Sequence, residues 1–443
     1  MDKLPNEIVA NICQHLQSDF AALAALSAVS SRLHLPVNEQ LYKTVSDLAL
    51  PTLALIEFHP SLTRPLFHVH HIHVSDQTSL AMFHAVLGNL IKHRDGHPIL
   101  SLTIRFPTIE LPVLFPNGVP PLYSTILRFS ISCSCRNPTH FLKMMGSFWT
   151  ASLTDLTLDF AHQLHPSSYD VIEQLFSDIL QSCPSLASWD IRLPTKDLNP
   201  QPLRLQNLLD DTTFTFHNLI IFRILLPRTT LSFANFLLRH PKIKTFAFII
   251  SRYPTDHAPY LGSLDVLPVL KSFHGSLSTT FSLVGGIHRP LHSLVLSYPG
   301  HSLHEFHQLT HVLRATPTLR ALEFAPVVGA TLGEIRSVTK CCPSLVRFTC
   351  TVQASQFYDK PSDVEALYHV ICNNLLNVNV VRVSFVPTND VDFGLSHKHA
   401  IQKAYKSSHD FRGSSPGIQM LEGCYHTVII TFYDNIVLWD CEL

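Results

Sequence analysis

One short apolar pattern recurs along this chain, and it limits the folds that the chain can adopt. In each copy an apolar anchor is followed by a second anchor three positions later and a third two positions after that. First anchors of successive copies lie 21 to 33 residues apart, 28 on average. The twelve copies, with glycine as the last anchor of the eighth, are Val69/Ile72/Val74, Ile99/Leu102/Ile104, Ile126/Phe129/Ile131, Leu153/Leu156/Leu158, Leu186/Trp189/Ile191, Leu219/Phe222/Ile224, Ile243/Phe246/Phe248, Leu270/Phe273/Gly275, Leu291/Leu294/Leu296, Leu319/Leu322/Phe324, Leu345/Phe348/Cys350 and Val378/Val381/Val383.

This spacing predicts a short β-strand that is entered through a turn. Alternate residues of a strand face the same side, so the second and third anchors share one face. Proline ends a preceding helix and keeps the residue before it extended. Apolar residues at helical spacing precede several of the prolines, for example Leu175 and Ile179 before Pro184. One unit is therefore expected to be a helix, a turn and a strand. Prolines lie just before six of the first anchors: Pro98, Pro184, Pro241, Pro290, Pro317 and Pro343.

A single unit of this kind cannot bury both of its faces, so stacked units must share one core. The period and the strand signature over about residues 50–385 resemble an irregular leucine-rich-repeat solenoid. We expect an α/β fold with parallel strands on one face and helices on the other. The asparagine ladder of the regular family is missing, and Gly275 makes the eighth unit doubtful. The alternative is an α/β domain that alternates helices and parallel strands without stacked repeats.

The N-terminal segment carries a different pattern. Pro5 suits the first turn of a helix, and Ser18 or Asp19 can cap the next one. Three small helices in about 45 residues fall below the size at which a core usually stands alone. A unit of this size should therefore bury its spare apolar face on something else. The apolar stripes are Ile8, Ile12 and Leu16, then Phe20, Leu23 and Leu26 with Val29 or Ser30, and, after an interruption at Pro36, Val37, Leu41 and Val45.

The order Leu-Pro-x-Glu-Ile, Ile, Leu, Leu-x-x-Leu-Ser-x-Val-Ser-x-Arg-Leu and Leu-Tyr in this segment resembles an F-box. F-boxes are three-helix modules that bind the Skp adaptor of cullin–RING ubiquitin ligases. The tryptophan often found after the second helix is absent here. The alternative is an ordinary N-terminal helical cap on the repeat domain. By resemblance, the helical core and the adaptor groove are shared among Leu4, Pro5, Ile8, Ile12, Leu16, Leu26 and Val29.

These patterns predict four segments: an F-box at 1–46, a leucine-rich-repeat-like solenoid at 47–385, a polar loop insert at 386–418 and a C-terminal β-hairpin cap at 419–443. The hairpin is predicted from the apolar runs 426–432 and 436–439, which flank Tyr433-Asp434-Asn435. Such a cap would cover the open end of the solenoid, which a soluble array requires.

Composition restricts the partners and the compartment. The net charge is −1, with 15% charged and 46% hydrophobic residues, which favours extensive burial and offers no nucleic-acid-binding face. We find no secretory signal and no apolar run long enough to span a bilayer. The ten cysteines form no Cys-x-x-Cys pair. We therefore expect a cytoplasmic or nuclear protein with free thiols and no membrane or nucleic-acid partner.

No common catalytic or phosphate-binding motif appears, so no enzymatic activity, cofactor or metal is expected. Two clusters provide a weaker zinc-binding or hydrolytic alternative. His68, His70, His71 and His73 cluster on a predicted strand, and two or three of them could face one side of it and present imidazoles to zinc. Cys133 and Cys135 lie near His140, although no third activating group is visible.

Between the second and third anchors, one residue per unit should point out of the predicted concave sheet. This row mixes charge and polarity, which suits a protein partner better than DNA. By resemblance, the chain would be the substrate-recognition subunit of an SCF-type cullin–RING ubiquitin ligase. Its partners would be a Skp-type adaptor, the ligase and an unknown target protein, and the alternative is a non-ligase leucine-rich-repeat interaction scaffold. The residues that we expect to contact the target are Asp190, Arg223, His274, Glu323 and Arg382.

Overall fold

The computed structural model has an α/β fold that divides into two compact units, unit 1 (Met1–Thr229) and unit 2 (Thr230–Leu443). We describe each unit by itself. The structure describes residues 6–16, 19–29, 31–45, 69–75, 80–93, 99–114, 126–134, 149–160, 169–192, 209, 214–226, 234–250, 263, 265–284, 289–298, 303–326, 329–353, 366–367, 370–371, 373–375, 377–378, 380–386, 421–422 and 426–431.

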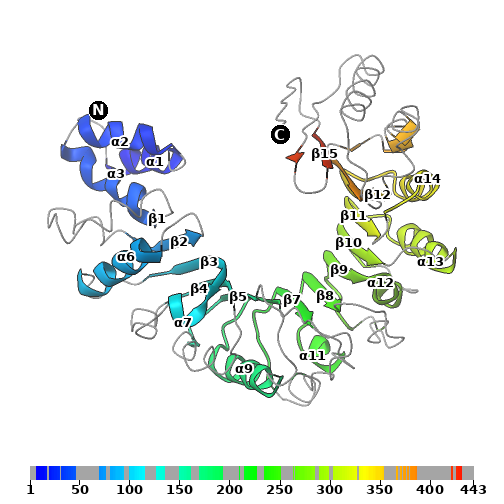
Figure 1. The fold of residues 1–443 in the computed structure, drawn as a ribbon, viewed down its shortest axis with the longest axis horizontal. Coiled ribbons are helices and arrows are strands. Elements are labelled where there is room, and N and C mark those ends of the chain that lie inside the picture. Colours follow the sequence, from blue (N-terminus) through cyan, green and yellow to red (C-terminus); the bar gives the residue numbers. More distant parts are fainter. Residues whose placement is uncertain are drawn as a thin grey trace. The chain divides into compact units, whose positions relative to one another are not determined.

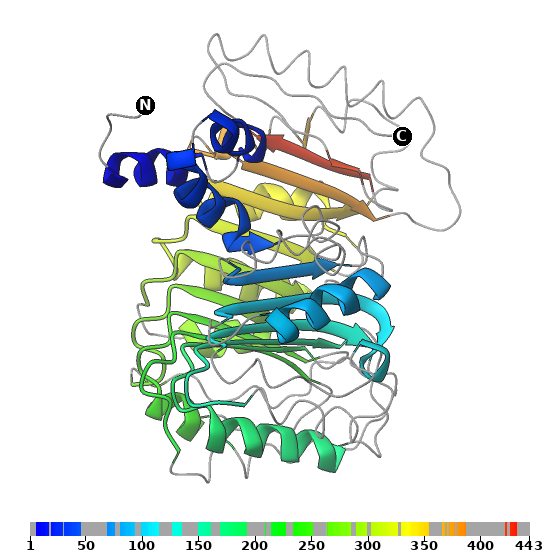
Figure 2. The ribbon, with the colours of Figure 1, turned by 90° about the vertical axis from the view of Figure 1, so that its left-hand side faces the viewer.

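Unit 1 begins with three helices and continues as a parallel sheet. The helices are α1 (Asn6–His15), α2 (Phe20–Val29) and α3 (Ser31–Lys43). Three further helices, α6 (Leu80–His93), α7 (Leu111–Leu114) and α9 (Tyr169–Ser182), follow individual strands and lie on one face of the sheet (Figures 1 and 2). The strands, each parallel to the next, are β1 (Thr44–Val45), β2 (His71–Ser75), β3 (Ser101–Glu110), β4 (Arg128–Ser134), β5 (Asp155–Phe160), β6 (Ser188–Arg192) and β7 (Ile221–Leu226).

Unit 2 repeats this arrangement and ends differently. Its strands are parallel from β8 through β13. Helices α11 (Ala234–Arg239), α12 (Leu277–Val284), α13 (Leu303–Arg314) and α14 (Leu332–Cys341) lie on one face of this sheet (Figure 1). The strands are β8 (Thr245–Ile250), β9 (Ser272–Ser276), β10 (Ser293–Tyr298), β11 (Ala321–Pro326), β12 (Arg347–Gln353), β13 (Val380–Val386), β14 (Leu421–Glu422) and β15 (His426–Thr431).

The strand register confirms the apolar pattern within each unit. The second anchors face one another across neighbouring strands, as Leu156 faces Trp189 and Leu294 faces Leu322. The third anchors also face one another across neighbouring strands. None of the twelve first anchors is more than 3% exposed. The doubtful eighth unit is a complete strand, because Gly275 pairs with Leu296 in β10. The prediction of parallel strands with helices on one face is therefore confirmed, and this arrangement is compatible with a solenoid-like repeat.

The prolines were predicted to end helices, and two of them also occupy a defined position in a turn. The first anchor closes a turn by donating its N–H to the carbonyl three residues earlier, as Leu186 does to Cys183 at 3.3 Å and Leu319 to Thr316 at 3.1 Å. Pro184 and Pro317 are the second residues of these four-residue turns, the position where the fixed φ of proline is favoured. Each turn brings the chain from the end of a helix into the next strand.

Backbone hydrogen bonds to the residue that follows the first anchor join one repeat to the next repeat. The carbonyl of His70 accepts hydrogen bonds from two consecutive amides, Leu100 at 2.8 Å and Ser101 at 3.1 Å. The same double contact recurs along both units, and each acceptor directly follows a first anchor. This carbonyl ladder uses no side chain, so it stacks the repeats without the asparagine ladder that the sequence lacks. Its acceptors are His70, Leu100, Leu127, Thr154 and Ala187 in unit 1, and Lys244, Lys271, His292 and Arg320 in unit 2.

The sheet face away from the helices stays accessible in each unit, and we call it the open face. Along β2 and β5 in unit 1 and β9 in unit 2, every second side chain is half-buried, while the residues between them are buried. Parallel sheets are usually covered on both faces. Among the described residues, no helix or strand covers this face of alternating half-buried side chains in either unit.

Two predictions about chain segments were wrong. Pro36 does not interrupt the third helix, because α3 runs from Ser31 through Pro36 to Lys43. Val45, which was placed in that helix, lies in β1 and pairs with Ile72.

The C-terminal end departs partly from the prediction. The predicted strand 426–432 is present as β15 and pairs antiparallel with β13. Its hairpin partner is β14, which precedes it, instead of the run 436–439, which lies outside the described residues. The polar insert was predicted at 386–418, but Val386 is the last residue of β13, and 387–418 lie outside the described residues.

A buried arginine holds together a region that the sequence pattern did not identify. Arg289 is 6% exposed, and its guanidinium donates to the carbonyls of Leu283 at 2.8 Å, Leu267 at 2.9 Å and Ser263 at 2.9 Å, and also to Val266. Burial lowers the pKa of Arg289 below its usual value. These charged hydrogen bonds join the turn before β9 to the end of α12.

Gly275 gives a direct test of the anchor packing. A Cβ atom at this position would lie 2.6 Å from Cζ of Phe273 and 3.2 Å from the carbonyl oxygen of Phe248. The glycine therefore makes room for the phenyl ring of the preceding anchor. We expect Gly275→Ala to reduce the free energy of unfolding by roughly 1–3 kcal/mol, measured by urea denaturation.

A second substitution identifies the cause of that loss. Phe273→Leu removes the ring atoms that the new methyl group meets, so the double variant should lose less stability than the sum of the two single variants. Additive losses would contradict this packing explanation.

Candidate functional site

Helices α1, α2 and α3 pack into a small bundle with its own core. The buried residues are Val9 and Cys13 from α1, Leu23 from α2, and Leu33 and Val37 from α3. Leu16, Leu26 and Leu41 are partly buried against this core. The face of α1 that turns inward is therefore that of Val9 and Cys13, and of the predicted stripe Ile8, Ile12 and Leu16 only Leu16 packs against this core.

Because α1 buries the face that carries Val9 and Cys13, other apolar side chains of the bundle stay uncovered. Ile8 is 44% exposed and Val29 is 69% exposed, while Ile12 is half-buried. We call Ile8, Ile12 and Val29 the bundle patch. Leu4 and Pro5, also predicted to contact an adaptor, lie outside the described residues. The predicted adaptor residues thus separate into core-facing Leu16 and Leu26 and the exposed or half-exposed bundle patch.

The ends of the helices fix the bundle locally. Asp19 caps α2 by accepting the N–H of Ala22 at 2.9 Å, as predicted. At the other end, α3 continues directly into β1, and the carbonyl of Lys43 accepts the N–H of His70 at 3.0 Å. The bundle is therefore joined to the first edge of the sheet by the backbone.

The open face of unit 1 brings two of the predicted target-binding residues together. Asp190 is buried, and its carboxylate lies 3.4 Å from Nε of Arg192 and 3.6 Å from a terminal nitrogen of Arg223. Burial disfavours the charged form of Arg192, but Asp190, followed by Asp159, outweighs burial and raises its pKa. Both arginines are about half exposed, so their guanidinium groups remain accessible to a partner.

The predicted residues of unit 2 lie apart from one another. His274 on β9 and Glu323 on β11 are separated by Val295 of β10 in the same register row. Arg382 on β13 is separated from Glu323 by Thr349 of β12. Residues two strands apart are about 9.6 Å apart. The described side chains therefore belong to one row without forming a cluster.

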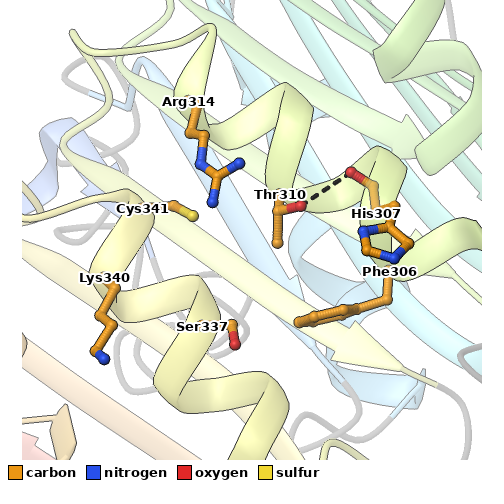
Figure 3. A pocket seen from close by; sticks show the side chains of 7 residues that line it. All are labelled: Phe306, His307, Thr310, Arg314, Ser337, Lys340 and Cys341. Carbon is orange, nitrogen blue, oxygen red and sulfur yellow. Dashed lines mark hydrogen bonds between the residues drawn. The ribbon is translucent and has the colours of Figure 1, made fainter. Parts of the chain in front are cut away.

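A pocket of about 470 Å³ lies between α13 and α14 (Figure 3). The Arg314 side chain extends toward Thr310 and Cys341, whereas the Lys340 side chain points away from Arg314. The hydroxyls of Thr310 and Ser337 donate to carbonyls of their own helices, those of His307 at 2.9 Å and Gly333 at 3.0 Å. The pocket therefore offers two cations and no carboxylate, and its hydroxyl protons are already in use. Its lining residues are Phe306, His307, Thr310, Arg314, Ser337, Lys340 and Cys341.

The weaker metal and thiol alternatives gain no support from the geometry. Within the described ranges no group of three or more His, Cys, Asp or Glu side chains is arranged to hold a metal ion. Burial, and then the charge of Arg128, lower the pKa of His71, but a neutral imidazole alone is not a metal site. Cys133 is fully buried, and its proposed neighbours Cys135 and His140 lie outside the described residues.

Comparison with models of known protein families gives no match, and no curated protein matches the chain either. The described helices include none that is long and apolar enough to cross a bilayer.

The buried thiols predict a specific alkaline instability. Burial raises the pKa of Cys183 and of Cys342 to about 12, from an ordinary value of 9.0. Below pH 9 both thiols are neutral in the folded and unfolded states, so their contribution is constant. Between pH 9 and 12 only the unfolded chain ionises, and stability falls by up to about 1.4 kcal/mol per pH unit per thiol.

Chemical denaturation between about pH 8 and about pH 11 measures this loss. Cys342→Ala should make the decline less steep, whereas Cys341→Ala, which removes the neighbouring half-exposed thiol, should change it little. If the free energy of unfolding declines equally in the unmodified chain, Cys342→Ala and Cys341→Ala, groups other than Cys342 cause the decline.

Proposed function

We propose that this chain is the substrate-recognition subunit of an SCF-type cullin–RING ubiquitin ligase. Helices α1–α3 would dock a Skp-type adaptor, and the open faces of the sheets would bind the target protein. Such a subunit catalyses nothing itself. It holds lysines of the target close to a charged ubiquitin-conjugating enzyme, and this raises their effective concentration.

The bundle patch is the observation that carries the proposal. The three helices bury a core of their own, yet Ile8 is 44% exposed and Val29 is 69% exposed to solvent. Together with the ordered F-box-like motif, these uncovered apolar side chains suit docking to a second chain. The half-buried Ile12 lies one helical turn from Ile8, so α1 offers both side chains along one side.

Target binding is supported by the open faces. They combine accessible arginines, such as Arg192 and Arg223, with half-buried hydroxyl and aliphatic residues. Interfaces between proteins use this kind of mixed surface, in which guanidinium groups provide directional hydrogen bonds.

The double variant Ile8→Gln/Val29→Gln tests the docking surface. Both substitutions keep helix-compatible side chains at solvent-facing positions, so the fold should persist. If the pair contributes about 2 kcal/mol as a buried hot spot, affinity for a purified Skp-type adaptor should fall about thirtyfold, measured by calorimetry on the full chain.

Gln14→Ala is the matched control, because Gln14 is exposed on the same helix and outside the bundle patch. It should bind the adaptor like the unmodified chain. If the unmodified chain does not bind the adaptor, or if the double variant binds it undiminished, the proposed docking surface is wrong.

The second candidate function, a non-ligase scaffold with an N-terminal helical cap, is favoured by one observation. The Lys43 carbonyl bonds to His70, so the bundle is continuous with the sheet edge. Under this alternative, removal of residues 1–46 should abolish cooperative thermal unfolding of the remainder, and no adaptor should bind. Under the ligase proposal, the shortened chain should unfold cooperatively and lose only the adaptor.

A further inference from the structure

A row of basic residues lies at the strand entrances of unit 2. Lys244, Lys271, His292 and Arg320 each directly precede a strand, from β8 to β11, and all four are exposed. We call these four residues the basic row. They occupy the ladder position of four consecutive repeats, so the fold brings together residues that lie 21 to 28 positions apart in sequence.

Backbone hydrogen bonds fix the spacing of the row. The N–H of Lys271 donates to the carbonyl of Lys244, His292 donates to Lys271, and Arg320 donates to His292, each at 2.8 Å. The four residues are therefore immediate neighbours at the strand spacing of about 4.8 Å, and the row spans about 14 Å. An extended peptide of about five residues has this length.

Little negative charge lies close to the row. In the described residues 241–250, 265–276, 289–298, 316–326 and 342–353, the acidic residues are Asp265 and Glu323. Within the described part of the chain no salt bridge involves Lys244, Lys271 or Arg320. Arg320 donates instead to the carbonyl of Ser344 at 3.3 Å.

The repeat itself does not need these charges. In unit 1 the equivalent ladder positions hold no lysine or arginine, and most are apolar or small. Like charges on directly neighbouring strands are destabilising, so the adjacent Lys244 and Lys271 do not favour folding. A negatively charged ligand would offset this repulsion. The equivalent residues in unit 1 are His70, Leu100, Leu127, Thr154, Ala187 and Ile220.

We propose that the basic row binds an extended acidic polypeptide segment of a partner protein. The adjacent first residues of the strands support a peptide, because Thr245, Ser272 and Ser293 provide hydroxyls beside the row. Single-stranded nucleic acids are usually held by aromatic stacking platforms as well as cations. The described half-buried and exposed positions of β8–β12 carry no Phe, Tyr or Trp, which argues against that ligand.

The inference rests on the proposed target-binding function and names the chemistry of the target. It is independent of the adaptor surface, so the two proposals fail separately. Row variants should bind the Skp-type adaptor normally, while bundle-patch variants should bind acidic peptide normally.

Fluorescence anisotropy with a labelled poly-glutamate peptide and the full-length protein tests the proposal. Lys244→Gln/Lys271→Gln should weaken binding about tenfold, since two exposed ion pairs are lost. Binding to the unmodified chain should also weaken as salt is added. Arg336→Gln, which removes an exposed cation of α14 outside the row, should leave the affinity unchanged.

Thermal unfolding checks that the row variants fold, and their midpoints should equal or exceed that of the unmodified chain because repulsion is relieved. The proposal is overturned if poly-glutamate does not bind, or if Arg336→Gln weakens binding as much as the row variant. It is also overturned if single-stranded oligouridine binds through the row more tightly than the peptide, since the row would then be a nucleic-acid site.

Discussion

The carbonyl ladder is the constraint on which the rest of this structure depends. One carbonyl per repeat accepts two amides of the next repeat, as His70 accepts Leu100 and Ser101. Because only backbone atoms take part, the ladder holds its spacing whatever the side chains are. The anchors then meet in register, and the residues between them form continuous rows on the open face.

The inward-facing residues of each strand stabilise the fold, whereas the outward-facing residues are available for recognition. The inward anchors are apolar throughout, and within each unit they bury one another across the strands. The outward positions are free to differ, and they do. Unit 1 carries the network of Asp190 with Arg192 and Arg223, whereas unit 2 carries hydroxyls at the first strand positions and the basic row at its strand entrances. Repeats with one architecture can therefore present two chemically different surfaces.

The N-terminal bundle likewise combines a buried apolar core with exposed side chains. Five buried side chains form its core, and this is little apolar surface for a free-standing module. The backbone continuity of α3 with β1 supports it from one side. The bundle patch is the surface that neither its own core nor this junction covers.

The sequence by itself determined the repeat period, the strand anchors and the turns, because these depend on apolar spacing and on the local geometry of proline. It also predicted the three N-terminal helices and the cap at Asp19. Only the tertiary structure decided which face of α1 turns inward, since Ile8 and Val9 are equally apolar and packing against α2 and α3 selects between them. It likewise decided that Arg289 is buried and that Phe273 fills the space beside Gly275. The basic row depends on stacking as well, since its members are distant in sequence and only the backbone ladder makes them neighbours.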